Sequence, residues 1–124
     1  MNVNAESYGQ AVILNCKGEL TGDSMSVLKQ AVEHQLEEAS PNVKDGAGGP
    51  RPQVRDVVLN LEQVPFIDSA ALEYLLELQQ RLLERQGQVK LAAMDENVAK
   101  ILEITRLESS FERFAELTQA VKTV

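Results

Sequence analysis

Apolar residues recur along this chain in two patterns, short continuous or alternating runs and longer stretches with a spacing of three and four. The short runs predict strands. We expect these strands at Ala11 to Lys17, at Val54 to Leu61 and at Val89 to Met94, with a shorter partner strand at Val3 to Tyr8. The run from Val54 to Leu61 is nearly all apolar in its second half, which is typical of a strand that is covered on both faces.

The longer stretches predict helices that begin after the last three of these strands, at Ala11 to Lys17, Val54 to Leu61 and Val89 to Met94. The first helix begins after Asp23 or Ser24, either of which can cap it, and the third begins after Asp95. We expect the second helix over Asp68 to Gln86, with Gly87 at the position where glycine often ends a helix. The apolar stripe predicted for this second helix consists of Leu72, Leu75, Leu76, Leu82 and Leu83.

Two short elements complete the pattern. Phe111 and Phe114 indicate a further extended or tight segment, and Glu116 to Val121 a short last helix. Strands that alternate with helices predict an α/β fold with a mostly parallel sheet. Residues 1–124 are therefore expected to form a single domain, with a flexible loop inserted at 40–53 where proline and glycine are frequent.

The composition narrows the classes of function. A hydrophobic content of 44% and a charged content of 25% are those of a soluble globular protein. The net charge of −7 argues against a nucleic-acid binder, which needs a basic surface. Cys16 is the only cysteine, so an intrachain disulfide is excluded and a cytoplasmic location is expected. No stretch reaches the roughly 20 apolar residues of a membrane span, and the N-terminus lacks the pattern of a signal peptide.

Ser69 is the main candidate for function. It follows a Pro-containing turn after the most apolar strand and stands where the second helix begins. A serine there can cap the helix. It can also carry a phosphate, whose charge the helix N-terminus favours. Asp68 is open to two interpretations as well, because its carboxylate can cap the helix or accept a hydrogen bond from the Ser69 hydroxyl.

Other chemistry has little support. A serine hydrolase would need glycines around Ser69 and a base, and His34 is expected on an exposed helix face. One cysteine and one histidine do not make a zinc site, and no motif for calcium or for a phosphate-binding loop is present, so no metal or cofactor is expected. Cys16 is expected in the core. Glu33, Glu37 and Glu38 form either a partner surface or simply a solvated helix face.

The residues from Asp56 to Leu72 resemble the signature of STAS domains, the family of the anti-sigma factor antagonists that also includes domains of sulfate transporters. The residues that carry this resemblance are Asp56 to Leu61, Val64, Phe66 to Ser69 and Leu72, together with Gly18-Glu19-Leu20. Five further positions resemble the family's third helix: Val98, Ile101, Leu102, Thr105 and Leu107. The resemblance implies a sheet of about four strands with interleaved helices. It also implies a regulatory binding protein rather than an enzyme.

By this resemblance, Ser69 is phosphorylated by a partner that is both anti-sigma factor and serine kinase. The unphosphorylated form binds that partner, phosphorylation ends the binding, and a phosphatase restores it. The resemblance places the docking surface at the turn before the second helix. The partner-binding residues are expected to be Val64, Pro65, Asp68, Ser69, Ala71 and Leu72.

Two features depart from the family pattern. Ala70 and Ala71 stand where the family commonly has a second Ser or Thr and then Gly, and the 40–53 loop is longer than usual. Related domains without a phosphorylation switch act as fixed subunits. A constitutive interaction module of a transport ATPase complex or a stress-signalling scaffold is therefore the alternative.

Overall fold

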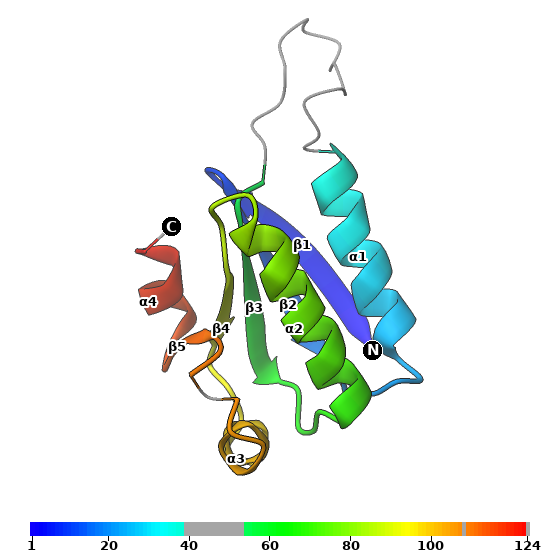
Figure 1. Cartoon of the computed structure of the whole chain (residues 1–124). Coiled ribbons are helices and arrows are strands. Elements are labelled where there is room, and N and C mark those ends of the chain that lie inside the picture. The colour runs from blue at the N-terminus through cyan, green and yellow to red at the C-terminus, as the bar shows by residue number, and fades with distance from the viewer. Residues whose placement is uncertain (39–53, 108, 124) are drawn as a thin grey trace, which may run out of the picture.

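The computed structural model describes residues 1–38, 54–107 and 109–123, so the predicted loop at 40–53 lies outside the described residues. Strands and helices alternate after an initial strand pair (Figure 1). In chain order the elements are β1 (Asn2–Tyr8), β2 (Ala11–Lys17), α1 (Met25–Glu38), β3 (Asp56–Gln63), α2 (Ser69–Leu83), β4 (Val89–Ala92), α3 (Glu96–Ile104), β5 (Glu112–Phe114) and α4 (Leu117–Val121). The predicted α/β class is confirmed.

The strands form one sheet in the order β1-β2-β3-β4-β5. β1 runs antiparallel to β2, and each later neighbour is parallel to the one before it. The described sheet therefore has five strands, where about four were expected. The additional strand is β5, the extended segment predicted around Phe111 and Phe114, which pairs with β4 over three residues.

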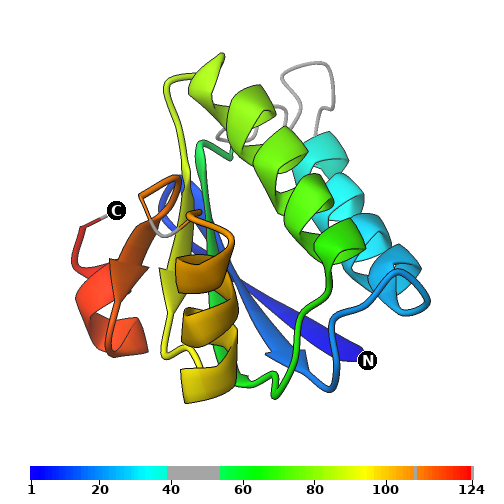
Figure 2. The ribbon, with the colours of Figure 1, turned by 60° about the horizontal axis from the view of Figure 1, so that its bottom comes forward.

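The main core lies between one face of the sheet and the helices α1, α2 and α3 (Figures 1 and 2). Alternate residues of β2 and β3 point into it, including Leu14 and Leu59, which are fully buried. The intervening residues Ile13 and Val58 point to the opposite face, where Ala120 of α4 packs on them. The alternation follows from the two-residue period of a strand, and it places β3 under cover on both sides, as its apolar sequence predicts.

The end of α2 corrects two details of the sequence prediction. Leu83 is 58% exposed, whereas Leu78 is fully buried, because successive helical residues point about 100° apart and the stripe turns away after Leu82. The residue with positive φ after the helix is Gln86, at 64°, and not Gly87. Gly87 is required for another reason, since a Cβ there would lie 1.8 Å from the carbonyl oxygen of Arg55.

Two charged residues are buried at the ends of the central strands. Asp56 accepts a hydrogen bond from the backbone N–H of Gln88 at 2.9 Å and so ties the start of β3 to β4. Lys90 of β4 donates to the hydroxyl of Thr123 at 2.6 Å and fastens the residues that follow α4. Both groups have partners, as buried charges require.

Candidate functional site

Backbone hydrogen bonds to Leu20 hold the turn between β3 and α2, one from each side of Ile67. The backbone N–H of Leu20 donates to the carbonyl of Phe66 at 3.0 Å, and that of Asp68 donates to the carbonyl of Leu20 at 3.1 Å. Leu20 and Ile67 thereby form a parallel bridge. These bonds join the β3–α2 turn to the β2–α1 turn, at the end of the sheet where α1 and α2 both begin (Figure 1).

Asp68 is the N-cap of α2. One carboxylate oxygen accepts the N–H of Ala71 at 2.9 Å, and the other accepts the N–H of Gly22 at 2.9 Å. These backbone donors hold the pKa of the Asp68 carboxyl below its usual value, the bond from Ala71 contributing most. The predicted capping role of Asp68 is therefore confirmed, and the carboxylate carries its negative charge throughout the neutral range.

Ser69 is the first residue of α2 and is exposed. Its hydroxyl makes no hydrogen bond to any residue that the structure describes, and both oxygens of Asp68 are engaged with backbone donors. The structure therefore does not contain the alternative hydrogen bond, from the Ser69 hydroxyl to the Asp68 carboxylate. Asp68 caps the helix, so the Ser69 hydroxyl is not needed as a cap. Since Ser69 is exposed, its hydroxyl faces solvent at the helix N-terminus.

The turn also corrects the predicted contact residues. Val64, Ala71 and Leu72 are buried in the main core, so in this conformation they support the turn from inside instead of meeting a partner. Pro65 and Ser69 are exposed, as a docking surface requires. Val64 and Ala71 cannot be exposed because they share the core face with Ile67, which packs there next to Leu20.

Phe66 is the residue that the sequence reasoning missed as a contact. Its side chain is 44% exposed, whereas the adjacent Ile67 is 2% exposed. Phe66 and Ile67 are both apolar and lie in a turn, where no fixed period indicates which of the two points inward, so no signal in the sequence distinguished them. An exposed aromatic ring three residues before Ser69 gives the turn an apolar centre.

The β2–α1 turn forms the other wall of this site. A Cβ on Gly22 would lie 3.4 Å from the Cβ of Ala70, so the two turns are in close contact. The Ser24 hydroxyl accepts the N–H of Thr21 at 3.0 Å and donates to the carbonyl of Glu19 at 2.7 Å. The Ser24 side chain therefore braces this turn.

The geometry gives no support to hydrolase or metal chemistry. His34 lies nine residues after Met25, about 13.5 Å along α1 from its start. α1 and α2 begin at the same end of the sheet, so His34 is well up its helix from that end (Figure 1). Burial raises the pKa of the Cys16 thiol to about 12, so it is not a reactive thiolate. Across the described ranges, no three His, Cys, Asp or Glu residues converge in a way that could hold a metal ion. The glycines at 46, 48 and 49 lie outside the described residues.

The predicted acidic surface on α1 is partly engaged within the chain. Glu33 receives two hydrogen bonds from the guanidinium of Arg81 and so links α1 to α2. Nothing is described of the side chains at 37 and 38. In the part of the chain that the structure describes, no helix combines the length and the apolar content that crossing a membrane requires.

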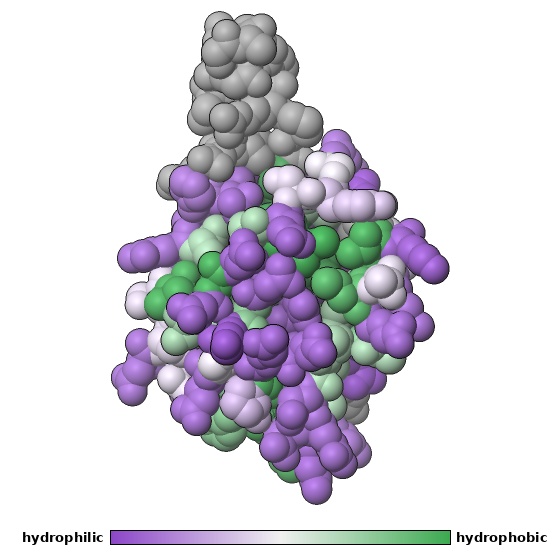
Figure 3. Space-filling view, turned by 180° about the vertical axis from the view of Figure 1, so that it is seen from behind, coloured by the Kyte–Doolittle hydropathy of each residue, from purple (hydrophilic) through white to green (hydrophobic). Residues whose placement is uncertain are grey.

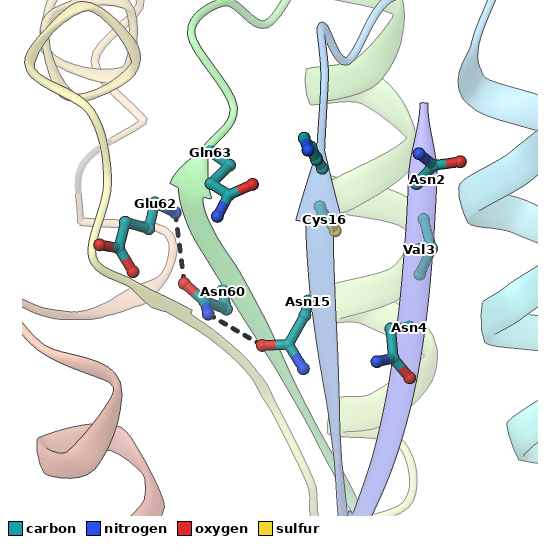
Figure 4. Close-up of a pocket in the computed structure, with 9 residues that line it drawn as sticks. Asn2, Val3, Asn4, Asn15, Cys16, Asn60, Glu62 and Gln63 are labelled. Atoms are coloured by element: carbon teal, nitrogen blue, oxygen red, sulfur yellow. Dashed lines mark hydrogen bonds between the residues drawn. The ribbon is translucent and has the colours of Figure 1, made fainter.

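A hollow lies at the outer face of the sheet, with a volume of about 360 Å³. Figure 4 shows Asn15 and Asn60 pointing toward each other across neighbouring strands, and the Asn60 amide donates to the Asn15 carbonyl at 2.8 Å. Asn2 and Asn4 of β1 also line it. Seen from behind, hydrophilic residues cover much of the middle of this face (Figure 3). No residue predicted for partner binding lies in this hollow.

A family model identifies the family of this chain, and solved structures share its fold. The family model of the STAS domain matches residues 2–121. No curated protein sequence is significantly similar to the chain. A Thermotoga maritima protein assigned provisionally as an anti-sigma factor antagonist has a TM-score of 0.80 at 20% identity, covering 98% of this chain and 93% of that one.

Three other solved structures share the fold at lower identity. The anti-sigma factor antagonist SpoIIAA in its unphosphorylated form has a TM-score of 0.74 at 17% identity, covering 98% of this chain and 95% of that one. SpoIIAA from Bacillus has also been solved in a phosphorylated form, with a TM-score of 0.69 at 15% identity, covering 98% of both chains. A sulfate transporter family protein from Wolinella succinogenes has a TM-score of 0.61 at 15% identity, covering 92% of this chain and 84% of that one.

Proposed function

The chain belongs to the STAS domain family, and on that basis we propose that it is an anti-sigma factor antagonist controlled by reversible phosphorylation of Ser69. In this proposal the domain is a regulatory binding protein of the cytoplasm and not an enzyme. Its partner is an anti-sigma factor with serine kinase activity, and a phosphatase reverses the modification. The exposed residues Pro65, Phe66 and Ser69 form the docking edge, which Asp68 holds in place.

One observation carries the proposal: the hydroxyl of Ser69 faces solvent at the start of a helix that Asp68 already caps. A serine that capped the helix itself would have its oxygen engaged with a backbone N–H. Here the preceding residue, Asp68, caps the helix. The Ser69 oxygen is therefore accessible to a kinase without loss of the helix cap.

Phosphorylation would change this edge strongly. A phosphate adds about −1.5 to −2 charges at neutral pH. It would stand next to the Asp68 carboxylate, whose lowered pKa keeps it ionised, and one helical turn before Glu73. It would also stand three residues after the half-exposed ring of Phe66. A partner that packs against Phe66 would have to bury a dianion beside a carboxylate, which is costly without new basic groups.

A pull-down from the host lysate tests the proposal, with wild type, Ser69→Ala and Ser69→Asp as parallel baits and mass spectrometry as the readout. We expect wild type and Ser69→Ala to retain a kinase-like or sigma-regulating protein that Ser69→Asp loses. Ser109→Asp is the matched control, because it adds the same charge to an exposed serine between α3 and β5. It should retain the partner.

The outcome also separates the proposal from its alternative, a constitutive interaction module. If all four baits retain the same partner, Ser69 does not control binding and the switch is excluded. A transport ATPase subunit or a scaffold protein among those retained would then identify a fixed subunit. The sulfate transporter protein among the structural neighbours makes this alternative a reasonable second candidate.

A further inference from the structure

β1 is an open edge of the sheet. It pairs with β2 over seven residues, and no other described strand pairs with it. The opposite edge, β5, has only three residues, two of which are the charged Glu112 and Arg113. A long edge strand offers a row of backbone donors and acceptors to another strand.

β1 itself lacks the sequence features that usually protect such an edge. Natural edge strands are blunted by proline, by lysine, by bulges or by shortness. Residues Asn2–Tyr8 contain no proline and no basic residue, and Glu6 is their only charged residue. The pairing of β1 with β2 runs without a register shift from Asn2↔Lys17 to Tyr8↔Ala11. This edge is therefore straight, long and nearly uncharged.

The backbone groups that point outward from β1 can be identified. Gly9, with φ 60°, and Gln10 form a two-residue turn, so Tyr8 and Ala11 close the hairpin as a hydrogen-bonded pair. The carbonyl of the neighbouring Gln10 points away from β1, toward β3, as the alternation of hydrogen-bonded pairs requires. It accepts a hydrogen bond from the backbone N–H of Arg55, just before β3, at 2.7 Å. Pairs alternate along an antiparallel ladder, so the even-numbered residues of β1 bond to β2. The N–H and C=O groups of Val3, Ala5 and Ser7 therefore point away from the sheet.

We infer that β1 pairs antiparallel with β1 of a second copy of this chain, in a register centred on Ala5. In this register Val3 faces the partner's Ser7, and Ala5 faces the partner's Ala5. These are the residues whose backbone groups point outward in both copies. All three therefore become hydrogen-bonded pairs, and the two sheets join into one.

The side chains suit a second copy better than an arbitrary strand. The register places Glu6 opposite the partner's Asn4, so the single charge of each strand meets an amide and never its own copy. Tyr8, which is 52% exposed, faces the partner's Asn2. A two-fold contact requires a self-complementary strand, and β1 meets that requirement with no like-charge pair.

This inference does not depend on the proposed phosphorylation. Ser69 lies at the turn that ends β3 and is held against the β2–α1 turn, which leaves it outside the β1 edge. The dimer would carry two copies of the docking edge. Failure of the dimer would leave the proposed function untouched, and failure of the function would leave the dimer untouched.

Sedimentation equilibrium from about 10 μM to about 1 mM tests the inference, because strand pairing alone gives a smaller contact than a standard interface and hence a weak dimer. The two test variants change one exposed residue. Asn4→Glu places a carboxylate opposite the partner's Glu6 twice per dimer, and Asn4→Lys places an ammonium there. We expect Asn4→Glu to raise the dissociation constant about fivefold or more, and Asn4→Lys to lower it.

Amide exchange provides a second readout that does not require a variant. The amides of Val3, Ala5 and Ser7 should exchange more slowly as the protein concentration rises, whereas those of Asn4 and Glu6 should not change. A chain that stays monomeric up to about 1 mM overturns the inference. So does a dimer whose dissociation constant is the same in wild type and in both Asn4 variants, because that dimer must use another surface.

Discussion

The carboxylate of Asp68 bonds to the backbone N–H of Gly22 at 2.9 Å, across 46 residues of sequence, while its other oxygen caps α2. One side chain therefore joins the starts of both long helices. Since these bonds are made to the ionised carboxylate, they are the reason that its pKa is lowered. The turn that presents Ser69 is consequently fixed by a residue immediately next to it.

Asp68→Ala should destabilise the fold by about 2 kcal/mol at neutral pH, because it removes a helix cap and a charge-assisted bond. The pKa of this carboxyl is lowered in the folded state, from 3.8. Its stabilising effect is therefore complete above that value and is lost as the pH falls through the lowered pKa. Urea unfolding of wild type and variant from pH 7 downward should give a constant difference above pH 3.8 and a difference that shrinks progressively below it. Asp68→Asn, which still caps, should lose less, and a difference between wild type and Asp68→Ala that stays constant below pH 3.8 would contradict this account.

Ser69→Ala and Ser69→Asp should both leave the free energy of unfolding within about 0.5 kcal/mol of wild type. The Ser69 hydroxyl bonds to no described residue, and a carboxylate at the first turn of a helix is mildly favourable. Thermal unfolding measures this directly. A loss above about 1 kcal/mol in Ser69→Ala would mean that Ser69 is a structural cap, and its binding phenotype would need another explanation.

Phe66→Ala should weaken binding to the captured partner about tenfold or more with little change in stability. Its ring is 44% exposed beside Ser69, and aromatic anchors often dominate the energy of an interface. Ile104→Ala is the matched control, because Ile104 is 72% exposed and is the last residue of α3, outside the β3–α2 turn. Titration calorimetry with the purified partner distinguishes the two. Equal losses in both variants would place the interface elsewhere.

Gly87→Ala should destabilise the domain by about 3 kcal/mol or more, since the new Cβ would lie 1.8 Å from the carbonyl oxygen of Arg55 and the backbone must move. Gly9→Ala is the control for backbone strain alone, because Gly9 has φ 60° and no atom within 4 Å of the added Cβ. It should cost only about 1 kcal/mol. Chemical denaturation compares them. Similar losses would show that the backbone can move the new Cβ away from Arg55 at little cost, and that the close approach to β3 does not require Gly87.

Much of the fold was predictable from the sequence because its signals are local. β2 has the predicted bounds, Ala11 to Lys17, since alternation of apolar residues is enough to define a strand. Asp95 caps α3 as predicted, with its carboxylate accepting the N–H of Asn97 at 2.8 Å. The exposure of the apolar residues in the β3–α2 turn was not predictable, because consecutive apolar residues in a turn have no fixed period. Val64 was expected at the surface and Phe66 was overlooked for this reason.

By itself, the sequence determined the order of strands and helices, the apolar faces of most of them, the family, and the position of Ser69 at the start of α2. Each of these features depends on the identity and spacing of residues that are close along the chain, and both can be read directly from the sequence. Only the tertiary structure decided that Asp68 reaches Gly22, that Gly87 passes against Arg55, and that β1 is left as an open edge. Each of these is a contact, or the lack of one, between segments far apart in sequence. Such contacts exist only once the whole sheet and its helices have packed.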